Sequence, residues 1–67
     1  MSWHYQLIRH TEPNGKVWYG VHEYYVYAGG YTVEPVRLAG DDKEDIKWML
    51  EKMLEDIEKH GVKDYER

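Results

Sequence analysis

Two short turn signals divide the first 38 residues of the chain into three strand-like runs. Asn14-Gly15 is typical of a tight hairpin, because a type I′ turn requires positive φ at both central residues. Gly29-Gly30 is a second signal of the same kind. The runs between them are rich in Tyr, Trp and β-branched residues, which favour strands. The pattern predicts an antiparallel meander with the strand order 1-2-3 and strands at about residues 3–11, 17–28 and 31–38.

The period of the hydrophobic pattern changes after the third run, and apolar residues then recur at helical spacing. Asp41, with Glu44 three residues later, resembles a capping box, and Gly61 is typical of the residue that ends a helix. The residues from 63 to 67 are expected to fray. We therefore expect a helix at about residues 42–60 with an apolar stripe made of Ile46, Met49, Leu50, Met53, Leu54 and Ile57.

These elements indicate a single α+β domain over residues 1–67, in which one helix packs on one face of a three-stranded sheet. Pro35 cannot donate a hydrogen bond to a strand ladder, so the third strand is expected at the edge of the sheet. A core of this size is marginal, and the absence of Cys excludes support from a disulfide. Self-association would supply part of the missing stability.

The register of the first hairpin decides which side chains the helix covers. If Asn14-Gly15 is a two-residue loop, Ile8 lies opposite Val21 on the same face of the sheet. One helix covers only one face, so the face with Ile8 and Val21 is then exposed to solvent. The face expected to receive the helix contains Trp3, Tyr5, Leu7, Trp18, Gly20, Tyr24 and Val26. A three-residue loop would turn the second strand over relative to the first. A bulge near His22 would exchange the faces midway.

The face left in solvent is the first candidate for a protein-interaction site. Apolar and aromatic residues in a contiguous patch often mark such sites, and Tyr is enriched at interfaces. The alternative is that one face of the sheet is simply wet and that Tyr serves as a strand former. The candidate residues on this face are Ile8, Tyr19, Val21, Tyr25 and Tyr27.

The outer side of the helix is a second candidate site. The net charge of −4 arises entirely after residue 38, where ten acidic residues oppose six basic ones. Glu44, Trp48, Glu51 and Glu55 lie together at helical spacing, opposite the apolar stripe. They would form an acidic, aromatic docking stripe for a basic protein surface. The alternative is a solvated face on which Trp48 folds over a lysine stem.

The residues that usually carry enzyme chemistry are sparse. The chain has no Cys, and Ser2 is its one serine, so a nucleophile paired with a base is difficult to build. His4 and His10 share a strand face but lie roughly 20 Å apart at 3.3 Å per residue, too far to bind one ion. If His22 faces the helix, it is expected to be a hydrogen-bonded core residue, and His60 lies at the helix end, where the dipole favours a cation. We expect no enzyme activity, no cofactor and no bound metal.

The charge distribution also bears on partners and location. An acidic half disfavours nucleic acid and anionic membranes as direct partners. The chain has no apolar run long enough to span a bilayer and no segment that resembles a signal peptide. We therefore expect a cytoplasmic protein that binds a protein partner or a second copy of itself, as a homodimer.

Four segments resemble a family of small uncharacterised bacterial proteins. They are Trp3-x-Tyr5, the run from Val17 to Glu23 (VWYGVHE), Glu34-Pro35-Val36 and the run from Trp48 to Leu54 (WMLExML). The resemblance implies a compact domain and adds no catalytic residue. By size and charge alone, the chain is also analogous to inhibitors of host defence or nucleic-acid-binding proteins from phages and mobile elements, which would act through the acidic helix face.

Overall fold

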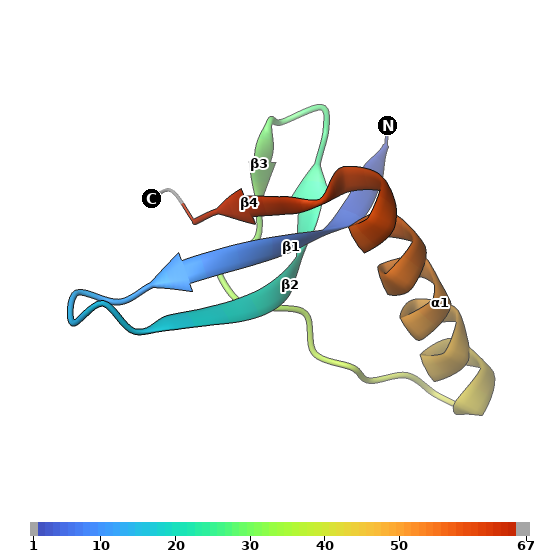
Figure 1. The fold of residues 1–67 in the computed structure, drawn as a ribbon. Coiled ribbons are helices and arrows are strands. Elements are labelled where there is room, and N and C mark those ends of the chain that lie inside the picture. Colours follow the sequence, from blue (N-terminus) through green and yellow to red (C-terminus); the bar gives the residue numbers. More distant parts are fainter. Residues whose placement is uncertain (1, 66–67) are drawn as a thin grey trace.

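The computed structural model describes residues 2–65, which form a four-stranded sheet and one helix (Figure 1). The strand order is β3-β2-β1-β4, with antiparallel pairing of β1 with β2 and of β2 with β3 and parallel pairing of β1 with β4. The protein is therefore α+β with a mixed sheet, and the expected three-stranded meander is only part of it. The elements are β1 (Trp3–Thr11), β2 (Val17–Tyr25), β3 (Gly30–Tyr31), α1 (Lys43–His60) and β4 (Val62–Asp64).

The first hairpin has a three-residue loop. The N–H of Glu12 donates to the carbonyl of Lys16 and the N–H of Gly15 donates to the carbonyl of Glu12, both at 2.8 Å. Pro13 occupies the second position of this turn, where its fixed negative φ fits, and Gly15 follows with a φ of 88°. The turn was placed correctly from the sequence, but the two-residue loop was wrong, because Pro13 belongs to the turn rather than to the strand.

The extra loop residue shifts the register by one position. Ile8 lies opposite Gly20 rather than Val21, so β2 is turned over relative to the expected pairing. The residues that were expected together on the helix-covered face therefore lie on both faces of the sheet, for example Tyr5 on the outer face and Trp18 on the inner face. The inner face carries His4, Gln6, Ile8 and His10 of β1 with Trp18, Gly20, His22 and Tyr24 of β2. The outer face carries Trp3, Tyr5, Leu7, Arg9 and Thr11 of β1 with Val17, Tyr19, Val21, Glu23 and Tyr25 of β2.

Curling of the sheet covers the inner face. The rings of Tyr31, in β3, and Tyr65, just after β4, belong to opposite edges of the sheet, yet their centroids are 5.8 Å apart. Ile8, on this inner face, is 0% exposed. The expectation that Ile8 lies on an exposed face is therefore wrong, because the register places it on the side toward which the sheet curls.

The second and third expected strands are shorter in the structure. β2 ends at Tyr25, whose carbonyl accepts hydrogen bonds from Ala28 and Gly29 in the following turn. After β3, Thr32 donates to the carbonyl of Glu23 and Val36 donates to the carbonyl of Val21, at 3.0 and 2.7 Å. Pro35 interrupts this pairing because it has no N–H. The segment after Tyr31 thus follows the edge of β2 without forming a regular strand.

β4 replaces the frayed end that the sequence indicated. It pairs in parallel with the middle of β1, and Tyr65 continues the pairing by donating to the carbonyl of Arg9 at 2.9 Å. Gly61, with a φ of 68°, lets the chain turn from α1 into this strand. Gln6 fixes the turn, because its Nε2 donates to the carbonyl of Gly61 at 2.9 Å.

The helix has the expected length but a different position. Asp42 caps it by accepting a hydrogen bond of 2.9 Å from the N–H of Asp45, and Gly61 ends it by donating to the carbonyl of Ile57. α1 lies beside the end of the sheet where β1 begins, rather than across a face (Figure 1). Among the described residues, the buried apolar side chains are those of Tyr5, Ile8 and Met53. The polar side chains buried with them belong to Gln6, His10, His22 and Asp56.

Candidate functional site

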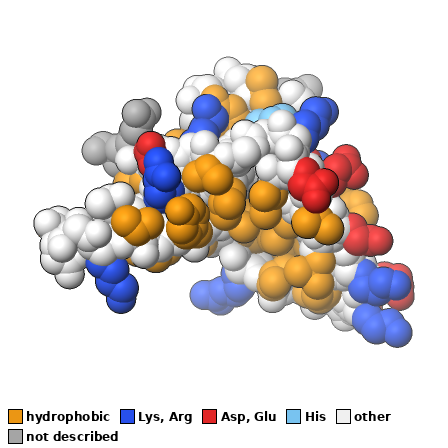
Figure 2. All heavy atoms as spheres, viewed as in Figure 1, with side chains coloured by type: hydrophobic (Ala, Val, Ile, Leu, Met, Phe, Trp, Pro, Cys, Tyr) orange, Lys and Arg blue, Asp and Glu red, His pale blue; other side chains and the backbone are white. Residues whose placement is uncertain are grey.

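The outer sheet face carries a row of apolar side chains along β2. Val17 is 47% exposed and Tyr19 is 55% exposed, and Val21 and Tyr25 are half-buried on the same face. α1 contacts the beginning of β1, where Tyr5 is buried, and leaves the hairpin end of the row open. Figure 2 shows hydrophobic side chains in a band that runs across this side of the molecule. We call Val17, Tyr19, Val21 and Tyr25 the outer row.

Two of the candidate sheet residues lie outside this row. Ile8 is buried on the inner face, beneath the curled edges of the sheet. Tyr27 lies in the turn after β2 and is exposed, with its ring centroid 6.0 Å from that of Tyr25. The structure thus brings Tyr19, Val21 and Tyr25 together and adds Val17, which alternates with them along the strand.

The charged groups around the outer row are already paired. Arg9 donates through Nε to Asp64 at 2.6 Å, and this hydrogen bond lowers the pKa of the Asp64 carboxyl. The hydroxyl of Tyr25 donates to the carboxylate of Glu23, which raises the pKa of Tyr25. Because these polar groups satisfy one another, the surface between them offers mainly apolar contact to a partner.

The acidic side of α1 forms the second candidate surface. Glu44, Trp48, Glu51 and Glu55 are all exposed, and Trp48 is 54% exposed. Trp48, Glu51, Lys52 and Glu55 line a shallow hollow of about 490 Å³. The ammonium of Lys52 bonds Asp56 at 3.1 Å and lies 5.0 Å from the centre of the Trp3 ring. The ammonium of Lys52 is therefore paired with Asp56 and lies near Trp3 of β1.

Two of the four histidines form a buried hydrogen-bonded pair on the inner face. Nε2 of His10 lies 2.9 Å from Nε2 of His22, and Nδ1 of His22 lies 2.8 Å from the carbonyl of Thr32. A carbonyl only accepts, so Nδ1 of His22 carries its hydrogen, and in the neutral pair His10 donates to His22. His10 also stacks on Trp18 with a centroid distance of 3.9 Å. His22 is a buried, hydrogen-bonded residue as expected, but the expected reason is wrong, because His22 faces the inner side of the curled sheet instead of α1.

The other two histidines stack on each other at the end of α1. The rings of His4 and His60 have centroids 3.6 Å apart and an angle of 13° between their planes. Burial lowers the pKa of His60, and the neighbouring His4 lowers it further. The environment of His60 therefore disfavours the cation that its place at the helix end suggested.

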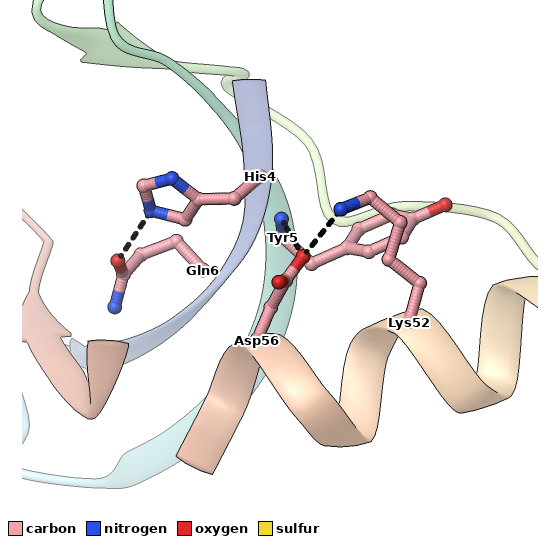
Figure 3. A network of polar contacts seen from close by, with 5 residues as sticks. All are labelled: His4, Tyr5, Gln6, Lys52 and Asp56. Atoms are coloured by element: carbon pink, nitrogen blue, oxygen red, sulfur yellow. Dashed lines mark hydrogen bonds and ion pairs between the residues drawn. The ribbon is translucent and has the colours of Figure 1, made fainter. Parts of the chain in front are cut away.

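Asp56 joins α1 to β1, a role that sequence reasoning missed. Its Oδ2 accepts hydrogen bonds from the N–H of Tyr5 at 2.9 Å and from Nζ of Lys52 at 3.1 Å (Figure 3). On the other side of β1, His4 bonds Gln6 at 3.2 Å. The one local signal for burial of Asp56 is its position in the sequence, directly beside Ile57 of the apolar stripe. These contacts position α1 against β1.

Over residues 2–65, no three or more His, Cys, Asp or Glu side chains are grouped so that they could hold a metal ion. In the same part of the chain, no helix combines the length and the apolar character needed to cross a bilayer. No family model, curated protein or solved structure matches the chain. The exposed surfaces on β2 and on α1 are the candidate sites that the structure describes.

Proposed function

We propose that this chain is a non-enzymatic protein-interaction module that binds a protein partner through the outer row. The supporting observation is that Tyr19 and Val17 are about half exposed on a regular strand. A Tyr side chain gives a large contact area and one polar tip, which suits a surface that is wet when free and buried when bound.

The position of the outer row in the sheet adds to this proposal. β2 is paired with β1 over all nine of its residues, so the row is held on a rigid backbone. Three alternate residues from Val17 to Val21 span roughly 13 Å at about 3.3 Å per residue. A rigid apolar row loses little conformational entropy on binding, so more of the contact energy remains as affinity. The partner is expected to present an apolar strip of its own.

A photo-crosslinking amino acid at position 19 tests this proposal in the native host cell. We expect one predominant crosslinked protein. The same amino acid placed at Arg37, in the loop before α1, is the control and should not capture this protein. With that partner purified, Val17→Asp should weaken binding by about tenfold or more, the usual effect of a charge placed in an apolar contact.

Val33→Asp is the matched control, because Val33 is 60% exposed but lies outside the outer row. It should leave the affinity unchanged. Equal effects of the two substitutions, or a capture pattern at position 19 identical to that at position 37, would contradict the proposal.

A second candidate function is favoured by Trp48, an exposed aromatic residue between exposed acids. The side of α1 with Glu44, Glu51 and Glu55 would imitate phosphate charge and block a host nucleic-acid-binding or defence protein. This function predicts binding that weakens steeply with salt and is abolished by Glu51→Lys combined with Glu55→Lys. Binding that is insensitive to salt would exclude it.

A further inference from the structure

The apolar stripe of α1 is not fully covered by the sheet. Met53 is buried, but Leu50 is 49% exposed and Leu54 is 62% exposed. The contacts of Asp56 with β1 rotate the helix so that these two leucines point away from the sheet. Because they are four residues apart, they lie one above the other on the helix surface. We call Leu50 and Leu54 the leucine ridge.

Two opposite charges flank the leucine ridge on the same side. Lys47 lies one turn before Leu50, and Glu58 lies one turn after Leu54, and both are exposed. At about 100° per residue, Lys47 and Glu58 fall along one line next to the ridge. Measured from the midpoint of the ridge, they are about 8 Å and 9 Å away along the axis at 1.5 Å per residue. The ridge thus has a positive end and a negative end at nearly equal distances from its centre.

We propose that a second copy of the chain packs on the leucine ridge, with the two α1 helices antiparallel about a two-fold axis. A two-fold interface presents the same patch twice, so the patch must be complementary to itself. In the antiparallel arrangement Leu50 of each copy meets Leu54 of the other, and Lys47 of each lies beside Glu58 of the other. A parallel two-fold arrangement would place Lys47 and Glu58 of one copy on the opposite side of the ridge from those of the other, so that neither charge would find its opposite.

The charges also separate this occupant from a lipid surface. A helix that lies on an anionic membrane carries basic residues on its polar face. Here Glu51 and Glu58 border the ridge along with Lys47, and the chain has a net charge of −4. The dimer uses α1, whereas the outer row lies on β2, so one dimer would present two outer rows.

Sedimentation equilibrium of the whole chain tests the dimer. The wild type should sediment as a dimer, and Leu54→Asp should sediment as a monomer with an unchanged far-UV circular dichroism spectrum. Lys47→Glu and Glu58→Lys should each weaken self-association by about tenfold or more. Each substitution places two like charges side by side at both symmetry-related contacts of the dimer. The double variant Lys47→Glu/Glu58→Lys exchanges the two charges and should restore the dissociation constant to within about threefold of the wild type.

Glu55→Lys is the matched control for Glu58→Lys. It makes the same charge change on an exposed residue of α1, but on the side away from the ridge, and it should leave self-association unchanged. Three results would each overturn the proposal: a monomeric wild type at the highest attainable concentration, a dimer that persists in Leu54→Asp, or a double variant no tighter than the single ones.

Discussion

The main-chain N–H of Tyr5 donates a hydrogen bond of 2.9 Å to Oδ2 of Asp56, across 51 residues of sequence. This bond holds the last turns of α1 against the first residues of β1, in a part of the strand that β4 does not reach. Burial alone would raise the pKa of the Asp56 carboxyl, but the hydrogen bonds from Tyr5 and Lys52 outweigh burial and lower the pKa below its ordinary value of 3.8. The ionised form of Asp56 is therefore the one that the fold stabilises.

Asp56→Ala should reduce the free energy of unfolding by about 1–3 kcal/mol at neutral pH, because the buried N–H of Tyr5 loses its acceptor. Asp56→Asn should cost less, since its amide oxygen still accepts from Tyr5. Because the folded-state pKa is lowered, the contribution of Asp56 is complete above pH 3.8 and is lost as the pH falls through the folded-state value. Urea denaturation of the three proteins at neutral and acidic pH measures both effects. A difference between wild type and Asp56→Asn that stays constant with pH would contradict this explanation.

The stack of His4 on His60 predicts a second pH dependence, in a higher range. The folded-state pKa of His60 lies below the ordinary value of 6.5, because burial and then His4 disfavour its cation. His60 is therefore neutral in both states above pH 6.5, and its effect on stability is lost as the pH falls from 6.5 toward the lower folded-state value. Thermal unfolding of wild type and His60→Gln between about pH 7 and pH 5 should show a steeper fall for the wild type. Parallel curves for the two proteins would show that the stack is not sensitive to protonation.

The turn after β2 offers a matched test of backbone conformation. Gly29 has a φ of 65°, whereas Gly30 does not have a positive φ, and a Cβ at either position would meet no atom within 4 Å. Gly29→Ala should therefore destabilise the fold by about 1 kcal/mol through backbone strain alone. Gly30→Ala should change stability by less than about 0.5 kcal/mol. Chemical denaturation of the two variants compares these effects, and equal effects would mean that φ is not the cause.

The histidine pair of the inner face predicts a difference between two substitutions at His10. His10→Leu removes the hydrogen bond to the buried ring of His22 and should destabilise the fold by about 1–2 kcal/mol. His10→Gln keeps an amide donor at a similar distance from the backbone and should recover part of the loss. Both variants lose the stack on Trp18, so the difference between them in urea denaturation reports the hydrogen bond offset by the more favourable burial of Leu. If the two variants are equally stable, the His10–His22 hydrogen bond contributes no more than this burial does.

The first hairpin shows how far the sequence could predict the candidate site. Asn14-Gly15 marked the position of the turn correctly, but the type I′ conformation that it predicted is wrong, because Gly15 has a positive φ and Asn14 does not. The loop length depended on whether Pro13 joined the strand or the turn, and this one residue decided which side chains of β2 share a face with β1. Tyr19, Val21 and Tyr25 were grouped correctly because they alternate along one strand. Ile8 was grouped with them wrongly because it lies on the other strand.

β4 could not be predicted from its own residues. Val62, Lys63 and Asp64 show no strand pattern, and all three are exposed in the structure. They form a strand because α1 ends at Gly61 beside the open edge of β1, where main-chain groups lack partners until β4 supplies them. This pairing depends on the three-dimensional position of the helix end, which no short window of sequence contains.

The sequence by itself determined the approximate positions of the two turns, the helix and the residue at which the helix ends, because these depend on glycine conformation and on side-chain spacing within a few residues. It did not determine the length of the first loop or that Gly30 belongs to β3. The tertiary structure alone decided which face of the sheet is covered, since curling brings Tyr31 and Tyr65 together over the inner face. It also decided the rotation of α1, because the bond from Tyr5 to Asp56 sets which side of the helix meets the sheet. The alternation along β2 grouped three residues of the outer row, but the exposure of the leucine ridge results from these long-range contacts, and local sequence patterns do not encode it.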